Sequence, residues 1–207
     1  ATWSRLLEKG RDSENDYIQV GRAFYQDKAY DKAEETFNKM IGKYPGNLQG
    51  FRWIADIASA KDPDSELGLA KPRFHTLLQK AAADSVKNVK EIHDALRYLG
   101  YEALQNKRYD EAKGYYHRMM NLSPEYRIRA HSSLSTMYMT MGDYPKAIEE
   151  NNKILAIEPG NEGARSSIQY ITQLQKSAQP KAHPNEITGV ISNSDGDPIP
   201  GASVRVK

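Results

Sequence analysis

Small and aromatic residues recur in one order along most of the 207-residue chain, and this repetition constrains the fold more than any other feature. The three clearest copies each hold a small residue, then a larger residue, then a closing proline: Gly21, Phe37 and Pro45; Gly100, Tyr116 and Pro124; Ser135, Asn151 and Pro159. A weaker copy, with Ala55, Ala70 and Phe74, lies between the first two. A period of about 34 residues is typical of stacked helix–turn–helix units, which bury a continuous core only when several are joined.

Packing geometry explains why the pattern needs these residue types. Gly21 and Phe24 lie three residues apart, on one stripe of a helix. Gly21 has no side chain and Ala33 a small one, so the two helices of the unit can approach closely, and Phe37 fills the space toward the next unit. Pro45 follows the second helix and prevents its continuation. The sequence therefore predicts repeated pairs of helices that pack face to face.

The second unit is longer than the others. The alanines that mark the second helices lie 37, 42 and 35 residues apart: Ala33, Ala70, Ala112 and Ala147. The extra residues fall in the turn-rich stretch 61–68, and further ones at 84–88. Asn88 and Glu91 have the spacing of a helix-capping pair, which predicts that Asn88 caps the next helix.

With this pattern the chain resembles the tetratricopeptide repeat (TPR) family over about residues 1–179. The resemblance implies an all-α fold, a right-handed solenoid of helix hairpins that ends in a capping helix. The units that we expect are four repeats and the capping helix: 14–47, 48–86, 90–126, 128–161 and 162–179. Residues 1–13 are expected to hold the second helix of a truncated repeat, because Trp3 lies 34 residues before Phe37. An N-terminal capping helix is the alternative.

The periodicity changes from helical to strand-like near the C-terminus. Residues 187–191 and 202–206 are two β-type runs, and the turn sequence Asp195-Gly196 lies between them. The stretch 187–204 resembles the opening of the carboxypeptidase-regulatory-like β-sandwich family, which implies a short β-hairpin fragment of a β-sandwich domain. We divide this part of the chain into a linker and a truncated β domain: 180–185 and 186–207. We expect the parent chain to be longer.

Composition argues against several classes of function. The net charge is only +2, whereas a dedicated nucleic-acid binder concentrates basic residues on one face. Cysteine is absent, which excludes disulfides and thiolate metal sites, and no apolar run reaches the ~20 residues needed to span a bilayer. The five histidines form no close metal-binding pair, and no phosphate-binding glycine loop or nucleophile elbow occurs. We therefore expect no enzyme activity, no cofactor and no metal.

Two further expectations concern single side chains in the last repeat. His131 occupies a packing position, which predicts a core or half-buried role. Glu149 and Glu150 lie together on a second helix, and we expect both to be solvated.

The TPR resemblance also implies where a partner binds, because such arrays hold peptide or protein segments in a concave groove that the first helices line. Carried over to this chain, the groove positions are: Arg22, Tyr25, Gln26, Arg52, Asp56, Ser59, Arg97, Tyr101, Gln105, Arg129, Thr136 and Met139. Chaperone-binding members hold a terminal carboxylate with a Lys/Asn set that is missing here, since Ile18, Gln19 and Arg22 occupy the matching places. The four arginines suggest an acidic partner instead, bound through charge-assisted hydrogen bonds.

Three functions compete on this basis. The repeats favour a non-catalytic protein-interaction scaffold. An array of this type joined to a regulatory-like β-sandwich is similar to envelope proteins of Bacteroidota, including a lipoprotein of their type IX secretion and gliding machinery. That resemblance implies a periplasmic or outer-membrane-associated protein, with an outer-membrane or peptidoglycan-associated complex as its partner. The alternative is a regulatory or adaptor arm of a larger sensor or enzyme, and an outer-membrane transporter ranks last.

Overall fold

The described residues, 12–178 of the computed structural model, form an array of α-helices without a strand. One short 3₁₀ helix (η1) lies among them. In chain order the elements are: α2 (Glu14–Gln26), α3 (Tyr30–Lys43), α4 (Leu48–Lys61), α5 (Ala70–Ala81), η1 (Ala82–Asp84), α6 (Val89–Gln105), α7 (Tyr109–Met120), α8 (Pro124–Thr140), α9 (Tyr144–Ile157) and α10 (Glu162–Ala178). For these residues the structure confirms the expected all-helical array.

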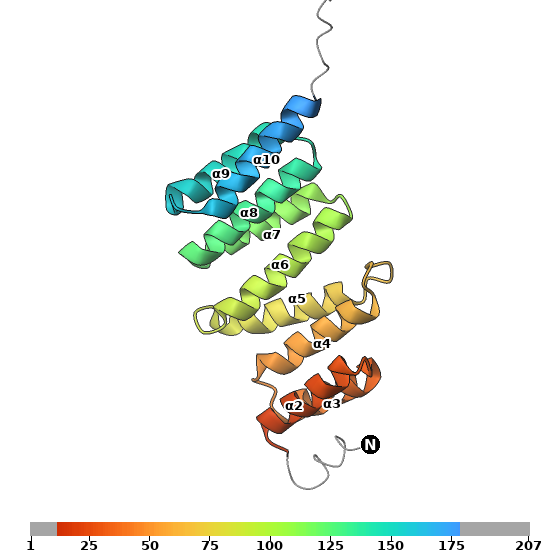
Figure 1. The fold of residues 1–207 in the computed structure, drawn as a ribbon. Coiled ribbons are helices and arrows are strands. Elements are labelled where there is room, and N and C mark those ends of the chain that lie inside the picture. The colour runs from red at the N-terminus through yellow and green to blue at the C-terminus, as the bar shows by residue number, and fades with distance from the viewer. Residues whose placement is uncertain (1–11, 179–207) are drawn as a thin grey trace, which may run out of the picture.

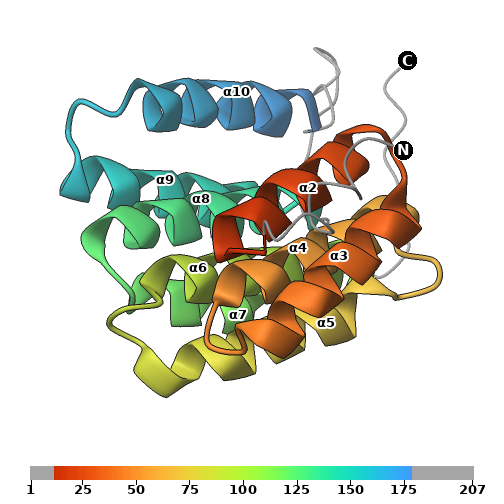
Figure 2. The same cartoon turned by 90° about the horizontal axis from the view of Figure 1, so that it is seen from below.

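The helices form four hairpins that stack in chain order, α2–α3, α4–α5, α6–α7 and α8–α9, with α10 on the last of them (Figure 1). Each helix packs mainly against its neighbours in the sequence. Seen along the stack, successive hairpins are rotated relative to one another, so the array winds (Figure 2). The first helices α2, α4, α6 and α8 thereby follow one another along the molecule.

The turns inside the three regular hairpins share one backbone conformation. Lys28, Lys107 and Gly142 have φ angles of 57°, 57° and 77°, which places them in the left-handed region. The residue after each one donates its backbone N–H to a carbonyl five residues earlier, as from Arg108 to Ala103 at 2.8 Å. These bonds satisfy carbonyl groups at the C-terminus of the first helix and reverse the chain. The same turn therefore sets the angle of all three hairpins.

The small residues of the repeat allow the close helix contacts that the sequence predicts. A Cβ atom at Gly21 would lie 2.5 Å from the ring of Phe37, and one at Gly100 would lie 2.4 Å from the ring of Tyr116. Phe37 is 0% exposed, and it stacks on Trp53 of the next hairpin with ring centroids 5.4 Å apart. An aromatic ring thus fills the space that the glycine leaves, and it also joins one repeat to the next.

The last hairpin uses hydrogen bonds where the first and third use a ring. Ser135 Oγ donates to the carbonyl of Ala147 at 3.0 Å, and the amide of Asn151 donates to Ser135 Oγ at 2.6 Å. His131 is 8% exposed, which confirms its predicted packing role. Its Nδ1 lies 2.7 Å from Oε2 of Glu150. Glu150 is 6% exposed, so the expectation that it is solvated was wrong; the carboxylate is buried because it meets His131 across the hairpin.

The long turn between α4 and α5 is organised by one buried carboxylate. Asp62 is 6% exposed and accepts hydrogen bonds from the backbone N–H groups of Leu67 at 3.1 Å and Leu69 at 3.2 Å. Burial raises the pKa of this carboxyl, but the backbone N–H groups of the turn outweigh it and hold the pKa below its usual value. The extra residues of the second repeat thus form an ordered turn.

Asn88 precedes α6 but does not cap it with its side chain. Its amide donates instead to the carbonyl of Ala81 at 3.2 Å, and α6 has no side-chain cap. The predicted capping pair with Glu91 is therefore wrong. The reason is local, because η1 brings Asn88 back beside the end of α5 and offers a free helix carbonyl there.

Three predicted segments fall outside the part of the chain that the structure describes: most of 1–13, the linker 180–185 and the β fragment 186–207. Ser13, the last residue of the first segment, caps α2. Its Oγ accepts from the N–H of Asp16 at 3.2 Å, and the Asp16 carboxylate accepts from the N–H of Ser13 at 3.1 Å.

Candidate binding groove

All twelve predicted groove residues lie on the first helices of the hairpins, and none of them is fully buried. Seven are exposed: Arg22, Gln26, Arg97, Tyr101, Gln105, Arg129 and Thr136. Five are half-buried: Tyr25, Arg52, Asp56, Ser59 and Met139. Some of these residues line one hollow together, and others are bound to side chains within the chain.

A hollow of about 440 Å³ lies between α6 and α8. Four of the predicted residues line it: Arg97, Tyr101, Gln105 and Thr136. The other lining residues were not predicted: Leu104, Lys107, Tyr109, Tyr116, Ser133 and Thr140. The spacing of Ser133, Thr136 and Thr140 is a helical stripe, and this signal in the sequence could have revealed the α8 wall.

The charge of this hollow has one sign. Arg97 and Lys107 line it, and no aspartate or glutamate is among the lining residues. Within residues 12–178 neither cation forms an ion pair, and Arg108 binds Glu102 and Glu111 near the α6–α7 turn. The two cations are therefore available to a ligand.

The two walls differ in hydrogen-bonding capacity. On α8, Ser133, Thr136 and Thr140 each donate their hydroxyl proton to the carbonyl four residues earlier, at 3.1, 3.1 and 2.9 Å. Their oxygens can therefore act only as acceptors toward a ligand. On α6, Tyr101 and Gln105 are exposed and carry donors. A ligand between the walls thus meets hydroxyl acceptors on α8 and, on α6, groups that can both donate and accept.

Leu104, Tyr109 and Tyr116 are among the residues with large apolar side chains that line the hollow. Leu104 is 6% exposed and Tyr116 is 2% exposed, so both are held by the core beneath. Burial, with a smaller contribution from the Tyr101 hydroxyl, raises the pKa of Tyr116 to about 12. The Tyr116 hydroxyl is consequently neutral at ordinary pH and adds no negative charge.

Two of the predicted groove residues on α4, Arg52 and Asp56, belong to a charge network that connects α4 to α6. Arg52 on α4 binds Asp56 at 2.9 Å and also binds Asp94 on α6. Burial and the charge of Asp94 raise the pKa of Asp56, although Arg52 and Arg97 act in the opposite direction. Burial also disfavours ionised Asp94, but hydrogen bonds from His93 and Arg52 outweigh it and lower its pKa. Arg52 therefore serves to hold two helices together, and the sequence reasoning missed Asp94.

Tyr25 and Arg129 are also occupied within the chain. Tyr25 contacts Trp53 with ring centroids 5.4 Å apart and Tyr30 at 5.6 Å. Burial, followed by the charge of Asp56, raises the pKa of Tyr25. Arg129 pairs with Glu125 at 2.8 Å on the surface of α8. Of the four arginines expected to face an acidic partner, only Arg22 and Arg97 lack an ion pair among the described residues.

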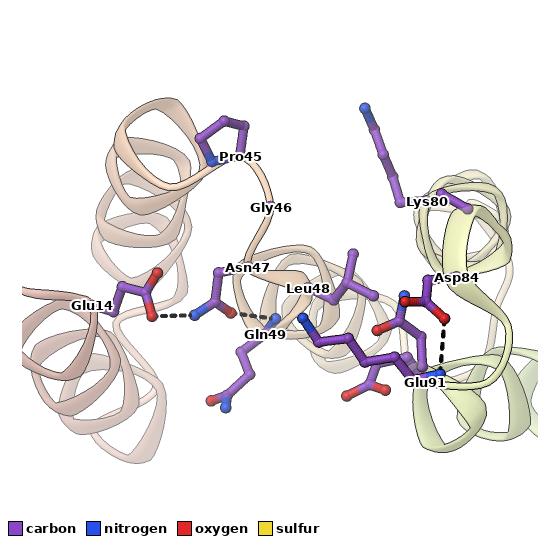
Figure 3. A pocket seen from close by; sticks show the side chains of 12 residues that line it. Glu14, Pro45, Gly46, Asn47, Leu48, Gln49, Lys80, Asp84 and Glu91 are labelled. Atoms are coloured by element: carbon purple, nitrogen blue, oxygen red, sulfur yellow. Dashed lines mark hydrogen bonds between the residues drawn. The ribbon is translucent and has the colours of Figure 1, made fainter.

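A second hollow, of about 610 Å³, lies at the turns before α4 and α6 (Figure 3). None of the predicted groove residues lines it. The amide of Asn47 bridges Glu14 and the backbone N–H of Gln49, and Asp84 accepts from the backbone N–H of Lys87. Its lining carries both charge signs, and these polar groups already bind one another, so this hollow is the weaker candidate.

Within residues 12–178 no cluster of three histidines or carboxylates could hold a metal ion. Over the same residues no helix is long and apolar enough to cross a membrane.

Comparison with known proteins agrees with the repeat architecture. No family model matches the chain. Over 158 residues the chain is 27% identical to a TPR repeat-containing protein of Methanocaldococcus jannaschii, in an alignment that covers 76% of this chain and 26% of that protein. The chain is similar to TPR proteins. Proteins of this type generally mediate interactions between proteins, and stacked repeats present extended concave surfaces for this purpose.

Two solved TPR structures are also similar to this chain. The C-terminal part of a TPR repeat-containing protein from Cytophaga hutchinsonii is 26% identical, with a TM-score of 0.41, over 75% of this chain and 47% of that one. A thermophilic TPR protein from Thermus thermophilus is 16% identical, with a TM-score of 0.45, over 83% of this chain and 87% of that one.

Proposed function

We propose that this chain is a non-catalytic scaffold that binds a segment of a partner protein along the first helices of its TPR-like repeats. The observation that carries the proposal is the hollow of about 440 Å³ between α6 and α8. Four of its lining residues are groove positions that the TPR resemblance implies, and it combines buried apolar residues with exposed polar ones. Interfaces between proteins generally have this composition.

The residues of the rim fit a binding role. Tyr101 is 56% exposed although its ring is large and apolar, and Arg97 beside it makes no ion pair among the described residues. Tyrosine and arginine are the residue types that most often carry binding energy at interfaces. Both stand on α6, whose inner face is fixed by the core, so the hollow is formed before a partner arrives.

We further propose that the scaffold works in the bacterial cell envelope, with a partner in an outer-membrane or peptidoglycan-associated assembly such as the type IX secretion machinery. The support is the resemblance of residues 187–204 to the opening of a carboxypeptidase-regulatory-like domain, which accompanies helical arrays in envelope proteins. Fractionation of the source bacterium tests this location. Recovery of the full-length protein in the cytoplasm would contradict it.

A second function, an adaptor arm of a larger sensor or enzyme, has one observation in its favour. The chain spans only 26% of the curated relative that it matches, whereas this function requires an array that is part of a longer protein.

Photo-cross-linking in the source cells tests the binding role. A photoreactive phenylalanine derivative replaces Tyr101 in one variant and Arg118 in the matched control. Arg118 is exposed on α7, outside the hollow. We expect a discrete adduct with one partner at position 101 and none at position 118. Adducts of equal yield at both positions, or none at either, would refute binding in the groove.

A further inference from the structure

We propose that the hollow between α6 and α8 selects an extended acidic segment, in which two carboxylates four residues apart flank one apolar side chain. The inference rests on the proposed binding function and adds the chemistry of the partner.

The spacing of the two cations sets the spacing of the two carboxylates. Arg97, Tyr101 and Gln105 follow one another at four-residue intervals on α6. With a rise of 1.5 Å per residue, Arg97 and Gln105 are about 12 Å apart along the helix axis. Lys107 lies just beyond Gln105, in the α6–α7 turn. The backbones of Arg97 and Lys107 are thus separated by slightly more than this length along α6.

An extended peptide matches that separation. Its rise is about 3.3 Å per residue, so side chains four residues apart are about 13 Å apart, and alternate side chains point to the same face. The first, third and fifth side chains of a five-residue stretch can therefore enter the hollow together. The outer two meet Arg97 and Lys107, and the middle one meets the floor. An α-helix would need its carboxylates about eight residues apart to span the same length, and its N–H groups are already bonded within the helix, so they could not use the acceptors on α8.

The charges of the neighbourhood favour anions at both ends. Arg97 and Lys107 have no carboxylate beside them in the hollow. Asp56 lies within electrostatic reach of Arg97, but Arg52 binds it directly at 2.9 Å. The two cations therefore keep most of their capacity for charge-assisted hydrogen bonds with a ligand.

The centre of the hollow favours an apolar side chain and an extended backbone. Leu104, Tyr109 and Tyr116 line the hollow together with the two cations and offer apolar surface. The hydroxyl oxygens of the α8 wall have committed their protons to α8 carbonyls, so they can accept from the N–H groups of a peptide. Tyr101 and Gln105 can donate to its carbonyls from the opposite side.

The experiment uses a synthetic peptide with blocked ends, acetyl-Gly-Ser-Glu-Ser-Phe-Ser-Glu-Ser-Gly-amide, carrying a neutral dye. Its affinity for the 207-residue chain is measured by fluorescence anisotropy. One control peptide has both glutamates replaced by glutamine, and another has them three residues apart. The blocked ends ensure that a side-chain carboxylate, and not a chain terminus, is tested.

We expect both control peptides to bind about tenfold more weakly, which corresponds to about 1.4 kcal/mol. Arg97→Gln and Lys107→Gln should each weaken the acidic peptide about fivefold and leave the glutamine peptide unchanged. Arg118→Gln, an exposed charge outside the hollow, should change neither. Raising the salt concentration from about 0.05 M to about 0.5 M should weaken only the acidic peptides.

Equal binding of the acidic and glutamine peptides, no response to Arg97→Gln, or no binding at about 1 mM peptide would each overturn the inference. Cross-linking at position 101 separates this failure from that of the proposed function. If an adduct forms at position 101 but the acidic peptide binds no better than the glutamine peptide, the groove binds a partner of another chemistry. If no adduct forms and no peptide binds, the groove is not a binding site.

Discussion

Replacing Gly100 by alanine places a methyl carbon 2.4 Å from Cε1 and 2.9 Å from Cδ1 of Tyr116. Carbon atoms in ordinary contact are about 3.5–4.0 Å apart, so the ring or α6 must move by about 1 Å. Tyr116 is 2% exposed and has little space into which to move. Forcing an extra methyl group into a packed core generally costs about 1–3 kcal/mol.

Part of this cost is offset by helix propensity. Alanine stabilises a helix interior by about 1 kcal/mol relative to glycine, so we expect a net loss of about 1 kcal/mol for Gly100→Ala. Gly114 on α7 is the matched control, because a Cβ atom there meets nothing within 4 Å. Gly114→Ala should therefore raise the free energy of unfolding by about 0.5–1 kcal/mol. The same substitution on the two helices of one hairpin should act in opposite directions.

Urea unfolding followed by far-UV circular dichroism measures both effects. A double variant, Gly100→Ala with Tyr116→Leu, gives the coupling energy between the two sites. Because the smaller leucine relieves the clash, the double variant should lose less stability than the sum of the losses in the two single variants. If Gly100→Ala stabilised the protein as much as Gly114→Ala does, the close contact between α6 and α7 would not require a glycine at position 100.

Three further changes test polar contacts of the array. Asn151→Ala removes the donor to buried Ser135 and should lower the free energy of unfolding by about 2 kcal/mol; an unchanged urea midpoint would contradict this. Burial raises the pKa of Glu150, but Lys153 and His131 outweigh it and hold the pKa in the folded protein below the usual 4.5. Ionised Glu150 therefore stabilises the fold above pH 4.5, and this contribution is lost as the pH falls through the folded-state pKa. Glu150→Gln should therefore flatten the thermal stability profile below pH 4.5, whereas an unaltered profile would exclude this group. Arg52→Gln leaves Asp56 and Asp94 without their shared cation and should lower the free energy of unfolding by about 2 kcal/mol. The loss is smaller than for a fully buried ion pair because these groups are partly exposed. Calorimetry measures the change, and a variant more stable than the parent would show that Arg52 does not stabilise the contact between α4 and α6.

The repeat pattern predicted much of the fold because it records contacts within one hairpin. Gly21 and Phe37 are close in sequence and in space, so residue size alone indicates how α2 and α3 meet. Contacts that depend on geometry between repeats left no such pattern. Asp94 was missed because its partner Arg52 lies 42 residues away. Glu150 meets His131 within one hairpin, and it was misjudged because the adjacent Glu149 suggested an exposed face.

For the candidate groove, the sequence indicated the helices that line it but only some of the lining residues. The TPR resemblance assigned Arg97, Tyr101, Gln105 and Thr136 to the groove-lining first helices, and in the structure these four line one hollow. It could not indicate which arginines are already paired, since that depends on the side chains opposite them, as for Arg52. Lys107 was missed because it belongs to a turn, outside the periodic stripe on which the prediction relied.

The polar contact of the last hairpin has a consequence for assembly. In an array of similar units, a first helix can pair with the second helix of a wrong unit, and repeat proteins misassemble in this way. The rings of Phe37 and Tyr116 each fill the space over a glycine, so either could fit the other's partner. Ser135 and Asn151 form a hydrogen bond that neither ring can replace, and a mispaired α8 would place the Ser135 hydroxyl group against a ring. One hydrogen-bonded pair near the end of the array thus favours the pairing of α8 with α9 over its pairing with the second helix of another unit.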